Sequence, residues 1–130
     1  MRVITFGTFD MFHIGHLSII ERAKKLGTHL TVGVSSDALN FEKKQRYPIC
    51  NESDRMRIVS ALACVDAVFL EESLEFKADY IKKYKADYLV MGDDWKDRFD
   101  NLKSLCDVVY LPRTPAISTT QLIEVVREIK

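Results

Sequence analysis

Short apolar runs alternate along the chain with longer segments in which apolar residues recur at helical spacing. The runs are rich in Val, Leu, Tyr and Phe, and they lie at residues 3–6, 30–35, 67–70, 88–92 and 107–111. Short runs without polar alternation are typical of strands in a parallel sheet, because such strands are buried on both faces. The pattern therefore predicts five buried strands.

Helical periodicity fills most of the remaining chain. It predicts helices over residues 15–26, 55–62, 74–85 and 117–130. The longest polar interruption, residues 40–51, is predicted as a loop, and long loops in compact domains are often functional. Regular alternation of strand and helix predicts a doubly wound α/β fold with a parallel sheet, formed by one domain over residues 1–130.

Composition narrows the classes of function. The 130 residues include 19 basic and 19 acidic side chains, so overall charge does not favour binding to nucleic acid or to a membrane surface. Any site for a polyanion must then be local. We expect no membrane insertion, because no apolar run approaches the length of a span. The three widely spaced cysteines are predicted to be reduced thiols, and a cytoplasmic location is expected.

The first candidate site is the segment GTFDMFHIGH, which follows the first predicted strand. His13 and His16 are three residues apart, so they share one face of the first helical turn, beside its free backbone N–H groups. Gly7 permits a sharp turn or a close approach of a ligand, and Gly15 leaves the backbone open to a bulky anion. This arrangement favours phosphate binding, because helix N-termini attract anions and imidazoles add directed donors.

Two alternatives remain for the histidines. They could belong to a zinc site with Asp10 as a third ligand, although a zinc site needs three or four close ligands. They could also be packed, hydrogen-bonded core residues.

The second candidate site is the segment RTPAISTTQL, which follows the last predicted strand. Ser118 and Gln121 have the spacing of a capping box, which marks the start of a helix. Around that start lie Arg113, Thr114, Ser118, Thr119 and Thr120. An arginine fork, hydroxyl groups and free helix N–H groups together describe a polyphosphate site, while the simpler alternative is that the hydroxyls only cap the helix. The P-loop and the dinucleotide fingerprint are both absent from the sequence.

Both segments resemble the signatures of a known family. GTFDMFHIGH resembles the G-x-F-D-x-x-H-x-G-H signature of the nucleotidyltransferase superfamily, and RTPAISTT resembles the R-T-x-x-I-S-T-T signature of its cytidylyltransferase branch. VMGDDWKDRFD, residues 90–100, is similar to the corresponding stretch of the bacterial cytidylyltransferases that act on glycerol 3-phosphate. The resemblance extends over essentially the whole chain.

The resemblance implies a Rossmann-like fold, a homodimer and a reaction. The reaction is transfer of CMP from CTP to glycerol 3-phosphate, which yields CDP-glycerol and pyrophosphate. Mg²⁺ is expected to be bound by the substrate without a dedicated protein site. The product would supply envelope or teichoic-acid-like polymers.

The resemblance also implies roles for individual residues. The expected catalytic residues are His13, His16, Lys44 and Arg113. The expected nucleotide-binding residues are Gly7, Thr8, Phe9, Asp10, Gly15, Arg46, Arg55, Asp94, Thr114, Ile117, Ser118, Thr119 and Thr120. The expected acceptor-binding residues are Lys43, Lys44 and Lys77. A basic loop that closes over the phosphates is expected to contain Lys44 and Arg46, with Lys43 as an alternative register.

Four positions carry alternatives or departures from the family pattern. Arg55 could instead hold a structural ion pair, and Lys77 could be a solvated surface charge. The family's arginine before the Val-Asp pair is absent, because Ala63 and Cys64 stand there, and Leu74 replaces a tryptophan on the acceptor side.

The expected mechanism is direct in-line attack by the acceptor phosphate on the α-phosphorus, without a covalent intermediate. Two rival functions remain. One is cytidylyl or adenylyl transfer to another small phosphorylated alcohol, such as phosphoethanolamine, phosphocholine or an alditol phosphate. The other is a domain that binds CTP without turnover.

Overall fold

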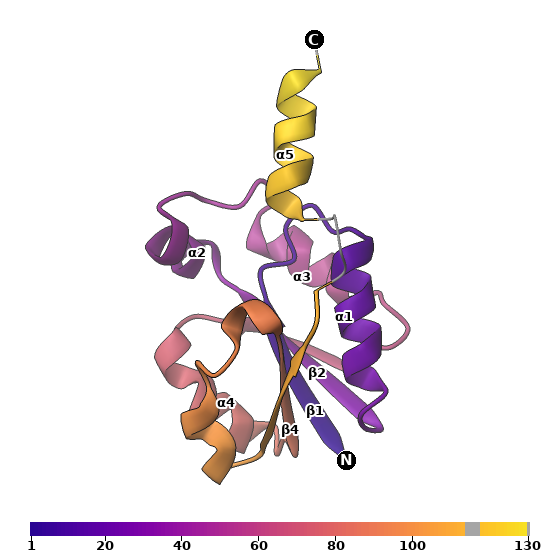
Figure 1. Ribbon diagram of the computed structural model, residues 1–130, viewed down its shortest axis with the longest axis vertical. Helices are drawn as coiled ribbons and strands as arrows, with labels where there is room; N and C mark the ends of the chain where they lie inside the picture. Colours follow the sequence, from indigo (N-terminus) through magenta and orange to yellow (C-terminus); the bar gives the residue numbers. More distant parts are fainter. Residues whose placement is uncertain (114–117, 130) are drawn as a thin grey trace.

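The protein is built around a five-stranded, all-parallel sheet with strand order β3-β2-β1-β4-β5 (Figure 1). The computed structural model describes residues 1–113 and 118–129. The strands are β1 (Arg2–Gly7), β2 (His29–Ser35), β3 (Ala67–Glu71), β4 (Tyr88–Gly92) and β5 (Asp107–Leu111). All five predicted strands are present, but the prediction that all are buried is wrong for β5, an edge strand with no fully buried residue. Strand order reverses at β1, so the carboxyl ends of β1 and β4 form the switch point where α/β proteins bind ligands.

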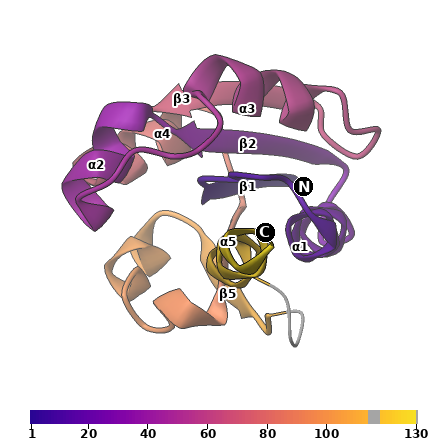
Figure 2. The same ribbon diagram turned by 90° about the horizontal axis from the view of Figure 1, so that it is seen from above.

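Helices cover both faces of the sheet. The α-helices are α1 (Ile14–Lys24), α2 (Asp37–Lys44), α3 (Glu52–Ser60), α4 (Lys77–Lys83) and α5 (Thr119–Glu128). Three short 3₁₀ helices occupy Leu74–Phe76, Asp93–Trp95 and Asp100–Ser104. Viewed from above, α2 and α1 flank the end of β1 (Figure 2).

The sheet has a hydrophobic core on each face, as expected for a doubly wound fold. On one face, Ile20 of α1 and Val59 of α3 pack against β-strand residues such as Val32, and all three side chains are fully buried. On the other face, Ile81 of α4 packs in the same cluster as Phe6 of β1. Burial of both faces explains why the strands read as uninterrupted apolar runs.

The segment predicted as a loop over residues 40–51 is partly helical, so that prediction is wrong for its first five residues. α2 runs to Lys44, and only residues 45–51 connect it to α3. The Ser36 side chain caps α2 by accepting a hydrogen bond from the Leu39 backbone N–H, and Leu39 and Asn40 are buried. Tertiary contacts thus stabilise a helix whose sequence is mostly polar.

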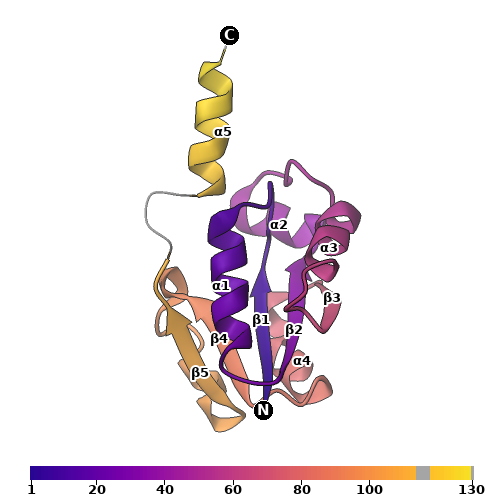
Figure 3. The same cartoon turned by 90° about the vertical axis from the view of Figure 1, so that its right-hand side faces the viewer.

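The other helices also differ from their predicted boundaries: α1 and α3 each begin and end earlier than predicted, and α4 and α5 are shorter. The α4 helix begins at Lys77, because residues 74–76 form a 3₁₀ turn capped by Ser73. α5 begins at Thr119, and the start predicted at residue 117 lies outside the described residues. α5 extends beyond the carboxyl ends of the strands, away from the sheet (Figure 3). Among the helices of the described ranges, none has the length and apolarity needed to cross a bilayer.

Candidate active site

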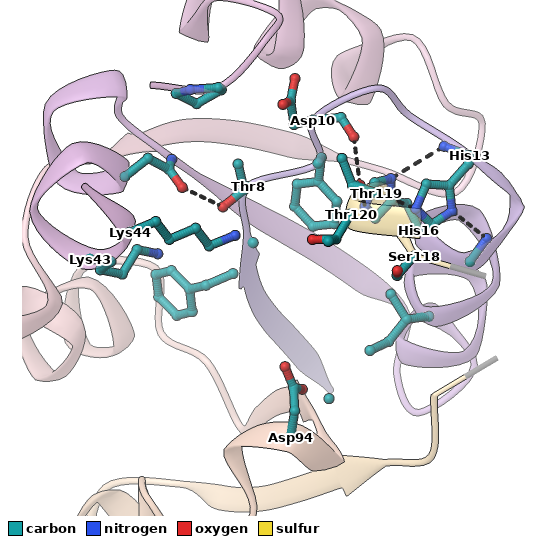
Figure 4. A pocket seen from close by; sticks show the side chains of 18 of the residues that line it. Thr8, Asp10, His13, His16, Lys43, Lys44, Asp94, Ser118, Thr119 and Thr120 are labelled. Atoms are coloured by element: carbon teal, nitrogen blue, oxygen red, sulfur yellow. Dashed lines mark hydrogen bonds between the residues drawn. The ribbon is translucent and has the colours of Figure 1, made fainter. Parts of the chain in front are cut away.

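A cavity of about 820 Å³ lies at the carboxyl ends of β1 and β4. Its walls come from the β1–α1 turn, from α2 and the loop that follows it, from the segment after β4, and from the first turns of α5. Figure 4 shows side chains from these elements pointing toward a common space. Segments distant in sequence therefore meet at the switch point of the sheet.

The β1–α1 turn has an unusual backbone that places the histidines. Phe9 and Met11 both have left-handed backbone conformations, with φ of 54° and 49°. The turn folds the Phe9 ring back over the end of β1, where a Cβ atom on Gly7 would lie only 2.7 Å from the ring. The absence of a side chain at Gly7 thus leaves room for the Phe9 ring, while the left-handed conformations that make the turn belong to Phe9 and Met11.

His13 and His16 cap the start of α1 together. His13 is the N-cap residue, and its Nδ1 accepts a hydrogen bond from the Gly15 backbone N–H at 3.0 Å. The Nδ1 of His16 accepts one from the His13 backbone N–H at 3.2 Å. The two rings stack with their centroids 3.8 Å apart. Because each Nδ1 acts as an acceptor, the proton of each neutral imidazole lies on Nε2.

Both Nε2 atoms face the first residue of α5. The Thr119 Oγ1 lies 3.3 Å from the Nε2 of His13 and 3.5 Å from that of His16. The same hydroxyl donates a hydrogen bond to the Asp10 carbonyl at 2.9 Å, so it accepts from the imidazoles (Figure 4). The N-termini of α1 and α5 therefore meet at the wall of one cavity.

Burial keeps the two imidazoles neutral. Burial, together with a smaller effect of the neighbouring His13, lowers the pKa of His16 to about 4. Burial also lowers the pKa of His13. At neutral pH the rings are therefore uncharged Nε2–H donors rather than imidazolium ions. Among the described residues, no group of three or more His, Cys, Asp or Glu side chains could hold a metal ion.

The predicted cap of α5 is confirmed, since the Ser118 Oγ accepts a hydrogen bond from the Gln121 backbone N–H at 3.1 Å. Ser118, Thr119 and Thr120 all line the cavity, together with Arg113. Thr114 and Ile117, which were also predicted as nucleotide-binding residues, lie outside the described residues.

The basic segment after β2 forms the opposite wall. Lys43 and Lys44 from the last turn of α2, and Arg46 just beyond it, line the cavity. Asp10 fixes the far end of the connecting loop, because its two carboxylate oxygens accept hydrogen bonds from the backbone N–H groups of Ile49 and Cys50, both at 2.8 Å. Asp10 thus lines the cavity and also anchors this loop.

Thr8 is held in place from the same side. Its hydroxyl donates a hydrogen bond to the Asn40 Oδ1 at 2.8 Å, and Asn40 is buried (Figure 4). Asn40 in turn donates to the carbonyls of Ser35 and Ser36. This network connects β1 to the base of α2.

Arg55 takes the structural role that was the alternative to nucleotide binding. Its guanidinium is buried and donates hydrogen bonds to the carbonyls of Cys50, Thr8 and Ser35. It also forms an ion pair with Asp37 at 2.7 Å. Arg55 does not line the cavity. Its hydrogen bonds and its ion pair connect the loops around it.

Lys77 is not a solvated surface charge, so that alternative is wrong. It is 3% exposed and pairs with Glu71, which is 1% exposed. It does not line the cavity, whereas Leu74, one turn earlier, does. Ala63 is exposed and also lies outside the cavity lining.

The remaining predicted residues lie together on the cavity wall: Gly7, Thr8, Phe9, Asp10, His13, Gly15, His16, Lys43, Lys44, Arg46, Asp94, Arg113, Ser118, Thr119 and Thr120. Sequence reasoning missed other lining residues, among them Arg22, Asn40, Trp95, Arg98 and Arg127. Trp95 and Arg98 lie within the motif of residues 90–100, so the resemblance of this motif to the family could have indicated them. Arg22 lies two turns after His16 on α1, where helical spacing could have indicated it.

The cavity is strongly basic although the chain is neutral overall. Seven Lys and Arg side chains line it, against the two carboxylates of Asp10 and Asp94. Neutral donors at paired helix N-termini, surrounded by cations at the switch point of a parallel sheet, are the arrangement that suits a polyphosphate in a nucleotide-dependent α/β enzyme.

Comparisons with known proteins assign the family. The model of the cytidylyltransferase-like family matches residues 4–125, and the chain belongs to this family. The chain is 47% identical to a glycerol-3-phosphate cytidylyltransferase of Bacillus spizizenii, over 93% of both chains. It is 46% identical to the enzyme of the same name from Bacillus subtilis, over 95% of both chains.

A solved structure shares the fold. The lipopolysaccharide core biosynthesis protein from Thermoplasma volcanium superimposes with a TM-score of 0.77 at 26% identity, over 88% of this chain and 98% of that one. The Rossmann-like nucleotidyltransferase fold implied by the motifs is confirmed.

Proposed function

We propose that this protein is a glycerol-3-phosphate cytidylyltransferase, which transfers CMP from CTP to glycerol 3-phosphate. The observation that carries the proposal is the pair of Nε2–H donors of His13 and His16, which meet Thr119 at the junction of two helix N-termini. The names of the relatives that match at 46–47% identity support this choice of nucleotide and acceptor.

The reaction follows from the arrangement of charges. An oxygen of the acceptor phosphate attacks the α-phosphorus of CTP, a new P–O bond forms, and the bond to the β-phosphate oxygen breaks. Pyrophosphate leaves with the electron pair of that bond. A phosphate monoester is already a nucleophile at neutral pH, so catalysis consists of positioning and charge stabilisation.

The histidines stabilise the charge that develops on the α-phosphate oxygens. Neutral Nε2–H donors fixed by the helix start require no reorganisation as the transition state forms. Lys44, Arg46 and Arg113 supply positive charge for the leaving pyrophosphate, since all three line the same cavity.

Mg²⁺ accompanies the triphosphate in this proposal. Mg²⁺ is usually bound through substrate phosphates and one or two carboxylates, with water in its remaining positions. Asp94 lines the cavity, while both oxygens of the Asp10 carboxylate accept backbone hydrogen bonds. Asp94 is therefore the carboxylate suited to the ion, which would neutralise charge on the phosphates.

The acceptor is placed at the side of the cavity formed by α2. Lys43 and Lys44 line that wall and suit the phosphate of glycerol 3-phosphate. Leu74 gives the same side an aliphatic surface for the carbon chain. Lys77 lies one layer behind the wall.

Three further features belong to this proposal. The protein acts as a homodimer, which the exposed apolar residues Val125 and Val126 on α5 support. It acts in the cytoplasm, and its CDP-glycerol enters a glycerol-containing envelope polymer of the teichoic-acid type.

A pyrophosphate-release assay over a matrix of substrates tests the function. CTP and ATP are each combined with glycerol 3-phosphate, phosphoethanolamine, phosphocholine and an alditol phosphate, and the product is identified by mass spectrometry. We expect CDP-glycerol from CTP and glycerol 3-phosphate at the highest kcat/KM. Faster turnover with ATP would make the protein an adenylyltransferase, and CTP binding without turnover of any acceptor would make it a binding domain.

A further inference from the structure

A buried chain of polar groups connects β2, β3, α2 and α4. It lies behind the side of the cavity that α2 forms, where the acceptor phosphate is proposed to bind. Glu71, at the end of β3, pairs through Oε2 with the ammonium of Lys77, the first residue of α4. Its other oxygen, Oε1, accepts a hydrogen bond from the Ser35 hydroxyl at 3.1 Å. The Ser35 Oγ in turn accepts from the Lys43 Nζ at 3.4 Å. One carboxylate is therefore linked to two lysines.

The Lys77 ammonium is held in an aromatic surrounding. Its Nζ lies 4.2 Å from the centroid of the Phe6 ring and 5.1 Å from that of Phe99. Ring faces attract a cation, but they do not replace the water that it has lost. Burial accordingly lowers the pKa of Lys77, and the negative charge of Glu71 opposes this effect.

The same carboxylate acts on the cavity wall. Lys43 lines the cavity, and so does Phe6, whose ring separates the ammonium of Lys77 from the open space. Burial lowers the pKa of Lys43, Glu71 raises it, and the nearby cations Lys77, Lys44 and Arg55 lower it. Glu71 is thus the anion that offsets a concentration of positive charge on this side of the site.

We propose that Glu71 is a positioning residue for the acceptor: it holds the ammonium group of Lys43 at the end of the cavity that receives the acceptor phosphate, and that of Lys77 directly behind this wall. The inference rests on the proposed function, since it concerns the acceptor half of that site. It assigns no contact between Glu71 and either substrate. Its effect reaches the acceptor through the two lysines.

The proposal makes a specific statement about pH. Without Glu71, burial would lower the pKa of Lys77 further, so its charge would be lost as pH rises through that lowered value. Acceptor binding should then weaken with rising pH over a range in which the parent enzyme is insensitive. A loss of packing alone would weaken binding equally at every pH.

The test compares Glu71→Gln with the parent and with Glu72→Gln, a matched control at the adjacent, exposed position. The KM for glycerol 3-phosphate is measured from about pH 6.5 to about pH 9 and expressed as a ratio to the parent at each pH, so that ionisation of the acceptor cancels. We expect a ratio that rises to about ten or more at the upper end, the scale of one charged hydrogen bond. At the lower end of the pH range the ratio should approach one. The Kd of Glu71→Gln for CTP should differ from that of the parent by less than about three-fold. Glu72→Gln should match the parent throughout.

A second variant covers the case in which Glu71→Gln does not fold, because removing one partner of a buried ion pair leaves an uncompensated charge. Glu71→Gln/Lys77→Met removes both charges, and we expect it to fold and to show a raised acceptor KM that depends less on pH than that of Glu71→Gln, because the opposing effects of the two lost charges on Lys43 largely offset each other. The proposal is overturned if Glu71→Gln gives a pH-independent ratio, or if the double variant keeps the parental KM.

The parent enzyme separates failure of this inference from failure of the proposed function. A parent that transfers CMP to a different phosphorylated alcohol refutes the choice of glycerol 3-phosphate, and the same series with that alcohol still decides the role of Glu71. A parent with no transferase activity would refute both.

Discussion

The side chains of His13 and His16 perform two tasks at once. Their Nδ1 atoms complete the hydrogen bonds of the first turn of α1, and their Nε2–H groups point at the start of α5. A substitution can therefore disturb the helix start, the donor, or both. Variants that separate these effects are needed to assign the role of each ring.

We predict that loss of either donor lowers kcat by about 100- to 1,000-fold, the usual effect of removing one transition-state hydrogen bond. His13→Asn and His16→Gln are the informative variants, because Asn is a good N-cap residue and Gln at the third helical position can complete a capping box. His13→Ala should lose the same activity and also about 1 kcal/mol of stability. Steady-state kinetics and urea denaturation measure the two effects. Normal turnover in a folded His16→Gln enzyme would refute the assignment.

The lowered pKa of His16 predicts a loss of stability in mild acid. In the unfolded chain His16 takes up a proton near its ordinary pKa of about 6.5, but in the folded protein only near 4. The unfolded state therefore binds more protons between these values, and the free energy of unfolding falls as pH falls through this window. The contribution of His16 is on the order of 2–3 kcal/mol.

Urea denaturation of the parent and of His16→Gln between about pH 7 and pH 4 measures this contribution. The Gln side chain does not titrate, so the stability advantage of the parent over the variant should shrink as pH falls. Parallel stability curves would show that His16 titrates normally in the folded protein.

Sequence reasoning found both histidines and the hydroxyl groups of residues 118–120, because these form dense local motifs. It could not find how they are oriented. That the Nδ1 atoms bond to the backbone, and that Thr119 lies between the two Nε2 atoms, depends on a contact between residues 103 or more positions apart. The same limit applies to Lys77: helical spacing placed it among surface lysines, and only the fold brings Glu71 to its ammonium.

At the scale of elements, α2 and the loop after it form one side of the cavity. Gln45, the C-cap residue of α2, has a left-handed conformation with φ of 57°. The other end of the loop is fixed by Asp10, which accepts hydrogen bonds from the backbone of Ile49 and Cys50. Between these points lie Arg46 and the exposed Tyr47, whose ring stacks on Phe41 at 4.7 Å. The non-helical segment between α2 and α3 is thus shorter than the sequence suggested.

We predict that CTP slows amide hydrogen exchange mainly over residues 45–50, because phosphate oxygens would pair with Lys44 and Arg46. Residues 37–44 should be protected without CTP, as expected for a capped helix. Arg46→Gln should reduce the change caused by CTP, whereas Arg57→Gln, an exposed control on α3, should not. Exchange over residues 45–50 that is unaffected by CTP would argue against closure of this segment.

The strands were predictable because each is an uninterrupted apolar run, and a sheet buried on both faces permits little else. α2 was not predictable, since residues 40–46 are almost entirely polar and its stability comes from Ser36 and from burial of Leu39 and Asn40. The helix predicted from residue 74 was shortened at its start, because the Ser73 hydroxyl caps a 3₁₀ turn there. Caps and tertiary contacts, rather than periodicity, set these boundaries.

At the scale of the whole molecule, α5 and its C-cap expose apolar side chains. Val125 and Val126 on the helix are 57% and 56% exposed, and Ile129, which caps it, is 70% exposed. The helix extends away from the sheet (Figure 3). Exposed apolar side chains on one face of a helix are typical of an interface. They are the residues on which the proposed homodimer depends.

We predict that light scattering in solution gives twice the mass of the chain, and that Val126→Glu gives the mass of a single chain, because a buried charge without a partner opposes association. Glu124→Gln, an exposed substitution on the same helix, is the control and should leave the dimer intact. A parent chain that is monomeric at micromolar concentration would refute the dimer.

The orientation of the two imidazoles also bears on whether either ring can act as a general base for an incoming nucleophile. With Nδ1 occupied by a backbone N–H and a proton already on Nε2, neither ring can remove a proton from an incoming group at neutral pH. Water and neutral alcohols need such a base to attack phosphorus, but a phosphate dianion does not. In the proposed reaction this arrangement suits a phosphate acceptor, which needs no base, and the two histidines offer no base to water or to a neutral alcohol.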